Sequence, residues 1–405
     1  MQKTKCVYLR SLQALCLTSF FIADVRDGLG PFLGIFLTEH HWQPDDIGLI
    51  MTVGGIAGLL TTLPAGVITD KSSCKRLLLA LLCLVITTAT LLLWFTHGNA
   101  MVALLLIISG ISASFVGPLM TGITLGLTGQ HGFNAQVGKN EAFNHAGNFL
   151  TALIAGGLAW FWGVGGIFIL MACTTLLTLL ALMAIRSSDI DNNAARGLES
   201  PTQQHVPDFS VLFKNSALLV TGLTLLLFHL ANAALLPMLS MRIASTPGSI
   251  NPGLYAAATI IISQVVMIPV AVQISGQIEK YGYWRLIMLA LLIMPVRAAL
   301  AATTGDPVMM IPVQILDGLA AGILGVAVPS FIVSLLRGSG HVNAGQSVVM
   351  LMQGAGASMS PALTGMIAGR YSFSVAFGAL SIIAMAALLI WWRYTPVLSA
   401  LNKVE

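Results

Sequence analysis

The sequence predicts an all-α membrane protein, with twelve transmembrane helices in two pseudo-symmetric six-helix halves around a central cavity. Three observations support this fold class. The 405 residues are 56% hydrophobic and only 8% charged, with a mean hydropathy of +0.88, far from the composition of a soluble domain. Apolar runs long enough to cross a bilayer recur along the whole chain, and landmarks of the first half recur in the second.

A helix needs about 20 predominantly apolar residues to cross ~30 Å of hydrocarbon at about 1.5 Å per residue. Twelve runs meet this requirement. In chain order they are 11–38, 46–69, 77–96, 100–129, 141–162, 165–185, 215–241, 253–277, 285–304, 307–336, 346–369 and 372–392. The 40 glycines and 16 prolines suit closely packed and kinked transmembrane helices.

Lysine and arginine set the orientation, because they favour cytoplasmic loops. With both termini in the cytoplasm, fifteen of the 19 basic residues fall inside: Lys3, Lys5, Arg10, Lys71, Lys75, Arg76, Lys139, Arg186, Arg196, Lys214, Lys280, Arg285, Arg337, Arg393 and Lys403. Arg242 and Arg370 fall in outside loops, whereas Arg26 and Arg297 lie within spans. Charges follow the first apolar run without an evident cleavage site, so we expect a retained first span rather than a signal peptide.

One long polar stretch interrupts the series of spans. Residues 187–214 contain many Asp, Asn, Gln and Pro residues and are expected to form a cytoplasmic linker. The linker separates an N-terminal half, 1–186, from a C-terminal half, 215–405. We expect an integral protein of a bacterial-type inner (plasma) membrane, present as a monomer.

The two halves repeat each other, which indicates duplication with parallel topology. Two landmarks recur at a shift of 208 residues and a third at 209. They are Phe20-x-x-Ala23-Asp24 with Phe228-x-x-Ala231-Asn232, Ser109-Gly110 with Asp317-Gly318, and Asp70-Lys71-x-x-x-x-Arg76 with Glu279-Lys280-x-x-x-x-Arg285. Repeats of this kind place a substrate site at the membrane midplane between the halves.

The first span carries three ionisable residues, Asp24, Arg26 and Asp27. A charge surrounded by lipid costs at least ~2.5–3.5 kcal/mol, so these residues need a specific role. On a helix the two acids share a face, and Arg26 points to another face. The functional hypothesis is that Asp24 and Asp27 line an aqueous cavity and that at least one takes up a proton or faces a cationic group. The alternative is a structural pair of Arg26 with an acid elsewhere.

The fifth span carries a polar stripe of Glu141, Asn144, His145 and Asn148, spaced three to four residues apart. One hypothesis is a proton relay with a hydrogen-bonding wall, because histidine titrates near neutral pH and a desolvated glutamate can do so. The alternative is interhelical hydrogen bonding, with Glu141 at the cytoplasmic mouth.

The C-terminal half offers further polar candidates within its spans. His229 and Asn232 share a helix face, and the repeat makes Asn232 the neutral counterpart of Asp24. Arg297 follows Pro295, and its most economical role is to pair with an acid such as Asp317. Gln264 and Gln353 contribute to substrate contact or, equally, to helix packing.

Other classes of function lack their signatures in this sequence. No His-Glu-x-x-His, Gly-x-Ser-x-Gly or phosphate-binding Gly-Lys-Ser/Thr motif is present, and the five cysteines show no metal spacing. A channel would need one polar ring rather than two halves. We expect no enzyme, cofactor, resident metal or nucleic-acid partner. An alternative is that Glu141 and His145 form half of a divalent-metal site, with Asp24 or Asp27 of the first span as the remaining ligand.

The loop after the second span carries a family pattern. Gly66-x-x-x-Asp70-Lys71-Ser72-Ser73-Cys74-Lys75-Arg76 resembles the Gly-x-x-x-Asp-Arg-x-Gly-Arg-Arg loop of the major facilitator superfamily, with departures at Ser73 and Cys74. The resemblance implies a rocker-switch secondary transporter with a gating loop at Gly66, Asp70, Lys71, Lys75 and Arg76. In it Asp70 is expected to interact with the cytoplasmic end of a neighbouring helix; the alternative is that these charges set topology alone.

The functional prediction is therefore a secondary active transporter that moves a small organic solute by alternating access. No nucleotide site is evident, so an ion gradient, most simply of protons, would supply the energy. Export of drug-like compounds is one hypothesis. The alternatives are import of a siderophore-like metal chelate or a metabolite, and facilitated transport without proton coupling.

Overall fold

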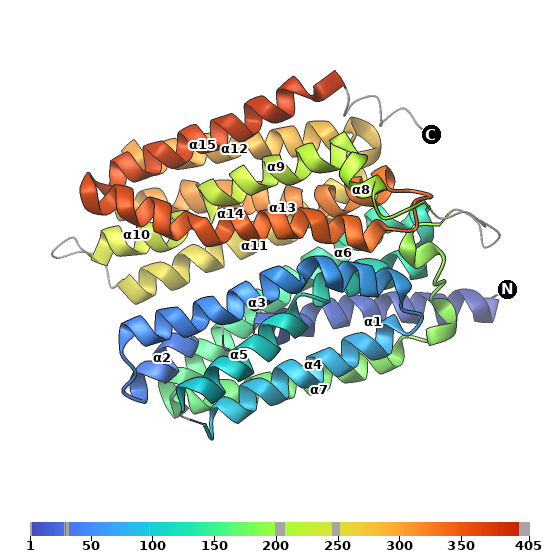
Figure 1. Ribbon diagram of the computed structural model, residues 1–405, viewed down its shortest axis with the longest axis horizontal. Helices are drawn as coiled ribbons and strands as arrows, with labels where there is room; N and C mark the ends of the chain where they lie inside the picture. Colours follow the sequence, from blue (N-terminus) through green and yellow to red (C-terminus); the bar gives the residue numbers. More distant parts are fainter. Residues whose placement is uncertain are drawn as a thin grey trace. The chain divides into compact units, whose positions relative to one another are not determined.

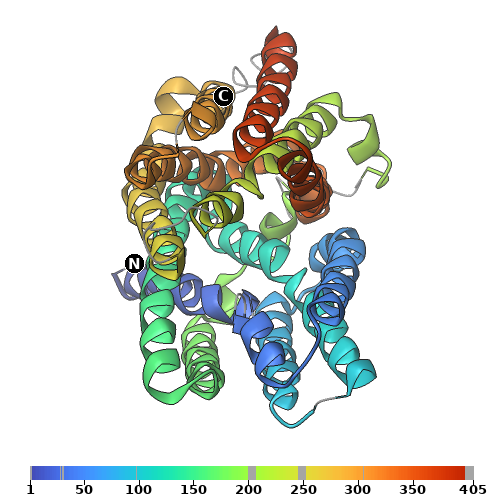
Figure 2. The same ribbon diagram turned by 90° about the vertical axis from the view of Figure 1, so that its left-hand side faces the viewer.

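The computed structural model describes residues 2–27, 29, 32–96, 98–198, 207–244, 252–303 and 305–396. These residues are almost entirely helical and contain no strand (Figure 1). Figure 2, turned by 90°, views the helices closer to end-on. The predicted all-α class is confirmed.

The chain divides into two compact units. The first comprises Met1–Gln136, Phe143–Val206 and Arg337–Ser347, and the second Val137–Ala142, Pro207–Leu336 and Val348–Glu405. Val137–Ala142, from the N-terminal part of the sequence, thus belongs to the second unit, and Arg337–Ser347, from the C-terminal part, belongs to the first. The predicted halves, 1–186 and 215–405, differ from the units mainly in these two segments and in the linker, whose described residues 187–198 group with the first unit.

The N-terminal elements correspond to the first six predicted spans. They are α1 (Gln2–Asp27), α2 (Phe32–Glu39), α3 (Pro44–Lys71), α4 (Lys75–Leu93), α5 (Asn99–Ala113), α6 (Val116–Trp162), α7 (Gly165–Ala184), η1 (Ser187–Asp189) and η2 (Ala194–Arg196). The first span is broken between α1 and α2. Gly129, with φ 61° and ψ −173°, breaks the long α6 into two helices, because this conformation is open to glycine.

The C-terminal elements correspond to the last six predicted spans. They are α8 (Val211–Lys214), α9 (Ser216–Asn232), α10 (Leu235–Ala244), α11 (Pro252–Tyr281), α12 (Tyr283–Thr303), η3 (Pro307–Met309), α13 (Met310–Leu335), α14 (Val342–Arg370) and α15 (Phe373–Arg393). The break between α9 and α10 mirrors the break between α1 and α2. At this break the Ala234 N–H donates to Ser360 Oγ at 3.0 Å, which satisfies a backbone group inside the span.

Nine helices of the described residues are long and apolar enough to cross a membrane. One of them, Asn99–Trp162, contains two predicted spans, and α1 and α14 supply the two that the nine do not include. The fifth span differs from the prediction at its start: its helix begins directly after Gly129, so residues 130–140 are helical rather than a loop. Gln136, buried in this extension, donates to Cys16 Sγ at 3.2 Å.

The predicted duplication recurs in the packing of the helices. In the first unit Gly110 of α5 lies against Gly54 of α3, where a Cβ on Gly110 would be 3.2 Å from the Gly54 carbonyl carbon. In the second unit Gly318 of α13 lies against Ser263 of α11, where a Cβ would be 2.7 Å from the Ser263 oxygen. These crossings are 208 and 209 residues apart in the sequence, so both units use the same close helix approach.

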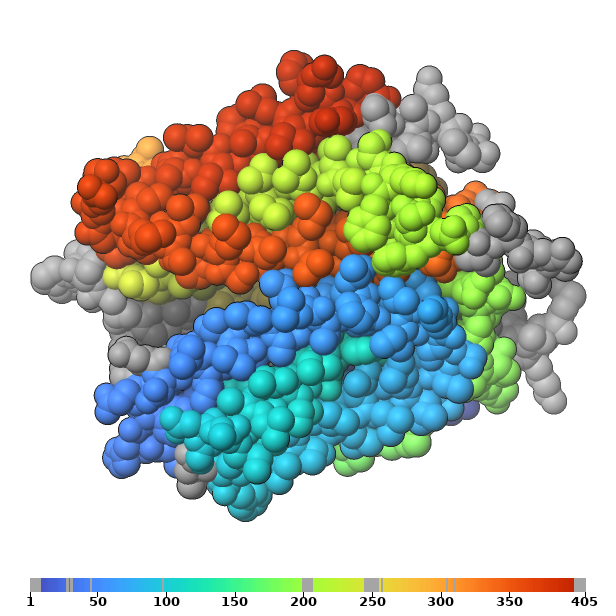
Figure 3. Space-filling model, in the orientation of Figure 1, coloured from blue at the N-terminus to red at the C-terminus, as the bar shows by residue number. Residues whose placement is uncertain are grey.

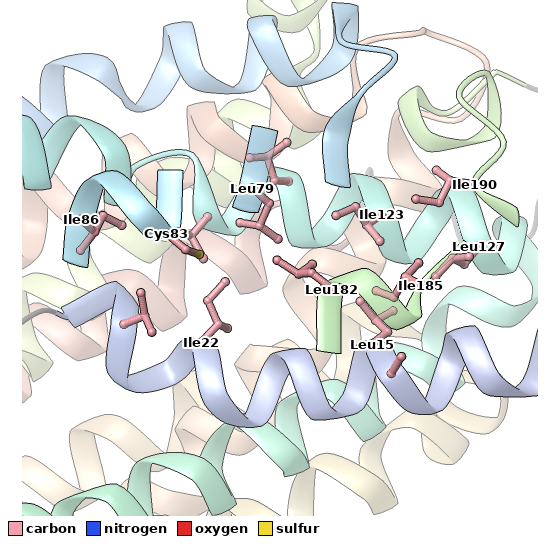
Figure 4. Close-up of a cluster of buried hydrophobic side chains, with 14 of the residues drawn as sticks. Leu15, Ile22, Leu79, Cys83, Ile86, Ile123, Leu127, Leu182, Ile185 and Ile190 are labelled. Carbon is pink, nitrogen blue, oxygen red and sulfur yellow. The ribbon is translucent and has the colours of Figure 1, made fainter. Parts of the chain in front are cut away.

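The core of the first unit is formed mainly by α1, α4, α6 and α7. Figure 4 shows Ile22 of α1 pointing toward Cys83 of α4, and Leu15 of α1 near Leu182 of α7, all fully or nearly fully buried. By contrast, large apolar side chains such as Leu60 of α3 are exposed on the outside. Figure 3 shows α3 and α5 at the surface of this unit. Apolar exposure of this kind matches contact with lipid chains.

Candidate functional site

Asp24 is half-buried on α1 and is held by the neighbouring helix α7. Thr174 Oγ1 donates to Asp24 Oδ2 at 2.6 Å, a short hydrogen bond of the charge-assisted kind. Arg26 is exposed, so it differs from Asp24 in its surroundings, as the helical phase predicts. The side chain of Asp27 lies outside the described residues. An intramembrane carboxylate is therefore fixed in orientation by a hydroxyl of α7.

The polar stripe of the fifth span packs partly against α1. Asn144 Nδ2 donates to the Ser19 carbonyl, and Asn148 Nδ2 donates to Asn144 Oδ1, both at 3.4 Å. Gly147 lies between them against the backbone of Phe20, where a Cβ would be 2.8 Å from the Phe20 carbonyl carbon. The interhelical role weighed for this stripe accordingly fits Asn144, whereas Asn148 bonds Asn144 within the same helix.

The rest of the stripe has different surroundings. His145 is half-buried in the first unit. Glu141 belongs to the second unit and lies beside α13, since a Cβ on Gly325 would be 3.5 Å from Glu141 Oε2. Glu141 is thus separated from Asn144 and Asn148 in its packing, although it shares their helix.

The second unit contains a buried ionic cluster joining three helices. Arg297 of α12, 1% exposed, pairs through Nη1 with Asp317 Oδ1 of α13 at 2.8 Å. The same nitrogen donates to Asn232 Oδ1 of α9, and Arg297 Nε donates to the Val313 carbonyl at 3.2 Å. The predicted pairing of Arg297 with Asp317 is confirmed. Asn232, the repeat counterpart of Asp24, carries no charge itself but accepts a hydrogen bond from the charged Arg297.

The other candidates of the second unit lie on the spans that contain them in the prediction. His229 is half-buried, and its Nδ1 is 2.9 Å from the Leu225 carbonyl, which implies a proton on Nδ1. Gln264 on α11 and Gln353 on α14 are half-buried.

Sequence reasoning missed several polar residues that the structure brings to these sites. Gln314 is fully buried, and its Oε1 accepts a hydrogen bond from Ser263 Oγ at 2.8 Å, one residue from the Val313 carbonyl that binds Arg297. A glutamine in an apolar run was the available signal. Thr174 gives no such signal, because buried threonines in helices commonly bond their own backbone.

Asp70, at the end of α3, binds the N-terminal turn of α14. Its Oδ1 accepts from the Asn343 N–H at 3.1 Å and from Asn343 Nδ2 at 2.8 Å, and its Oδ2 accepts from the Ala344 N–H at 2.8 Å. The first N–H groups of a helix lack intrahelical partners and carry the positive end of its dipole, so a carboxylate stabilises them. The expected contact of Asp70 with a helix end is confirmed.

The neighbours of Asp70 have distinct contacts. Lys75, almost fully buried, donates from Nζ to the Ser72 carbonyl at 2.6 Å. Arg76 Nη1 donates to the Ile185 carbonyl just after α7, and Lys71 is exposed. Gly66 admits the close approach of α14, since a Cβ there would be 2.5 Å from the Asn343 carbonyl oxygen.

The fold and these sites define a class of protein: an integral membrane protein of duplicated helical units with ionisable groups inside its spans. The sequence model of the Major Facilitator Superfamily matches residues 15–344, and the chain belongs to this family. It is therefore a transporter rather than an enzyme, and it carries out secondary transport of a small-molecule solute.

Relatives and solved structures agree with this assignment. The chain is 33% identical over 391 residues to the uncharacterized MFS-type transporter MT2531 of Mycobacterium tuberculosis strain CDC 1551, covering 96% of this chain and 93% of the relative. The same values hold for Rv2456c of strain H37Rv.

Two solved transporters share the fold at low sequence identity. The human organic anion transporter MFSD10 (TETRAN) superposes with a TM-score of 0.72 at 16% identity, over 95% of this chain and 99% of that one. The transporter FucP in its outward conformation superposes with a TM-score of 0.73 at 12% identity, over 96% and 99%.

Proposed function

We propose that this transporter moves a small polar organic solute across a bacterial inner membrane and couples the movement to protons by alternating access. The observation that carries the proposal is the ion pair between Arg297 and Asp317 inside the spans of the second unit. Ionisable groups within spans are costly and commonly mark proton and substrate pathways.

The pair has two chemical states with different contacts. When Asp317 is ionised it binds Arg297, whereas a protonated Asp317 no longer neutralises the guanidinium. Arg297 then keeps neutral acceptors, among them Asn232 Oδ1, the Val313 carbonyl and Met294 Sδ. Breaking a buried pair leaves an uncompensated charge, which favours a rearrangement that supplies a new partner. Proton binding at Asp317 would thus bias the conformation of the second unit.

The first unit supplies a second proton-binding candidate. Asp24 is fixed by Thr174 and remains half-buried, which suits a carboxylate that meets a water-filled cavity. Asp27, Glu141 and His145 complete the proposed proton path, while Arg26 joins Asn144, Asn148, His229, Asn232, Gln264 and Gln353 as proposed solute contacts.

Asp70 is the proposed lock of one conformational state. Its bonds to Asn343 and Ala344 hold the start of α14, and Gly66 allows the close approach. Lys71, Lys75 and Arg76 complete this gating loop. We place the loop and both termini in the cytoplasm, and we propose a monomer.

Proton coupling can be tested in proteoliposomes that contain a trapped pH dye. A panel of sugars, amino acids, organic cations, organic anions and metal chelates is added outside, and the internal pH is recorded with and without an imposed proton gradient. A coupled solute changes the internal pH: acidification indicates that protons enter with the solute (symport), and a rise in pH indicates that protons leave in exchange for it (antiport).

The matched variants are Asp317→Asn and Asp208→Asn, the latter an exposed loop acid of the second unit. We expect the first to abolish proton movement with the solute and the second to leave it intact. Solute uptake without any pH change in the unsubstituted protein would instead establish facilitated transport and refute the coupling.

A further inference from the structure

The chain that follows α7 folds back onto the first unit instead of leaving it. We call residues 185–198 the strap. It forms the two short turns η1 and η2, and it buries four apolar side chains among its polar ones: Ile185, Ile190, Ala195 and Leu198. A tether that only spans a distance needs no such burial, so the strap is a packed part of the unit.

The strap packs on the end of the first helix of α6. The Asp191 N–H donates to the Gly126 carbonyl at 2.9 Å. A Cβ on Gly126 would lie 2.8 Å from Ile190 Cγ2 and 3.0 Å from Ala195 Cβ. The absence of a side chain at Gly126 therefore leaves the space that Ile190 and Ala195 occupy, which we call the seat of the strap. Figure 4 shows Ile190 and Ile185 near Leu127 at this end of the core.

Polar contacts secure the strap at its ends. Ser11 Oγ of α1 donates to Asp189 Oδ2 at 2.6 Å. Asp191 Oδ1 accepts from the N–H groups of Asn193 and Ala194 at 2.8 and 3.1 Å and so shapes the turn that leads into η2. The turn closes at Gly197 in the left-handed conformation, with φ 88°.

The strap also binds the segment Arg337–Ser347. Asn343 Nδ2 donates to the Ala195 carbonyl at 2.9 Å and to Asp70 Oδ1 at 2.8 Å, so a single amide serves both. Beyond η2, the Gly338 N–H donates to the Gly197 carbonyl at 2.7 Å. The strap and Asp70 therefore hold the same residue at the start of α14.

We infer that the strap is a latch that works with Asp70 to hold the first turn of α14. The segment Arg337–Ser347 lies in the chain between α13 and the remainder of α14, both in the second unit. A rearrangement that moves the start of α14 away from Asp70 must also break the bonds of Asn343 to Ala195 and of Gly338 to Gly197. The inference does not depend on the identity of the solute or on protons.

Two buried reporters separate docking of the strap from release of α14. Ala195→Cys reports on the strap, and Ser347→Cys, which lies beside Gly66, reports on the start of α14. Each is placed in a background with serine at Cys6, Cys74 and Cys173. The rate of modification by a maleimide is measured on the purified full-length protein in detergent.

Gly126→Val fills the seat of the strap, and Gly157→Val is its control, since nothing lies within 4 Å of a Cβ at Gly157, which is also in α6. We expect Gly126→Val to raise the labelling rate of both reporters by about tenfold, the scale of one lost hydrogen bond. Gly157→Val should change neither rate. A milder variant, Asp191→Ala, removes the turn contacts at an exposed side chain and should raise both rates by about fivefold.

Each outcome below either supports or overturns the inference. If Gly126→Val does not fold, the same outcomes are measured with Asp191→Ala. A rise at both reporters supports the latch. A rise at the Ala195→Cys reporter alone would show a docked linker that does not hold α14 and would overturn it. No rise at either reporter would show that the strap is not seated through these contacts, which would overturn it too.

Discussion

Arg297 and Asp317 form an ion pair between α12 and α13, with 2.8 Å from Nη1 to Oδ1 and exposed fractions of 1% and 13%. The unequal exposure matters, because the acid is the member that water or a proton can reach. Asn232 and Val313 supply further acceptors to the guanidinium, so the arginine remains partly solvated by the protein when the acid changes its charge.

Removing one member of this pair should destabilise the protein more than removing both. Arg297→Met leaves Asp317 without its cation and is expected to cost about 3–5 kcal/mol, whereas Arg297→Met with Asp317→Leu should recover most of this loss. Thermal unfolding in detergent, followed by intrinsic fluorescence, measures the difference. If the double variant is no more stable than Arg297→Met alone, the loss of stability does not come from leaving Asp317 unpaired, and the prediction is wrong.

Asp70→Asn should weaken the hold on α14 while leaving insertion intact. The carboxylate accepts three hydrogen bonds from Asn343 and Ala344, and the loss of its charge is expected to cost about 1.5–3 kcal/mol. Labelling of Ser347→Cys should accelerate, and transport kinetics should change more than the amount of inserted protein. Glu279→Gln, the exposed counterpart in the repeat, is the control and should do neither. Unchanged labelling and unchanged transport would contradict the gate.

Thr174→Val should slow proton-coupled transport without reducing the amount of folded protein. Valine keeps the shape of threonine but removes the 2.6 Å hydrogen bond to Asp24, worth about 1.5–3 kcal/mol to a charged group, so a tenfold slower initial rate is expected. The control is Thr178→Val, because Thr178 Oγ1 donates to the backbone of its own helix at 2.8 Å. Equal rates for the two variants would remove Thr174 from the mechanism.

Gly147→Leu and Gly356→Leu should destabilise the fold to a similar degree, because each glycine lies against the backbone of another helix at nearly the same distance. A Cβ would lie 2.8 Å from the Phe20 carbonyl carbon in the first case and 2.9 Å from that of Leu226 in the second. Overpacking of this kind is expected to cost about 1–3 kcal/mol or more. Size-exclusion profiles of tagged protein measure the loss, and Gly157→Leu, with open space around it, should remain monodisperse.

The spans were predictable because hydropathy over about 20 residues is a strong signal, and the pairing of Arg297 with Asp317 was predictable because a buried charge needs a partner. The third member, Asn232, was predicted as the neutral counterpart of Asp24 but not as a partner of Arg297. Its contact with Arg297 depends on how α9 and α12 pack, and no local pattern encodes that.

The strap shows the opposite case. Its composition is typical of a solvated linker, and its four buried apolar residues do not make a periodic pattern. Its seat is a missing side chain at Gly126, which in sequence is one of 40 glycines. Asn343 was missed for a related reason: it follows a short turn, and its two acceptors come from residues 70 and 195.

Asp27→Asn and Glu141→Gln test the proton path proposed for the N-terminal spans. Asp27 follows Asp24 by three residues in the sequence, and Glu141 lies beside Gly325 of α13. Neutralising an obligatory proton carrier should abolish accumulation driven by a proton gradient, while exchange of labelled for unlabelled solute persists. Both are measured in everted vesicles with and without an imposed gradient, once a solute is identified. If both variants accumulate solute like the unsubstituted protein, neither acid carries the coupled proton, and the ion pair at Asp317 remains the proposed site of coupling.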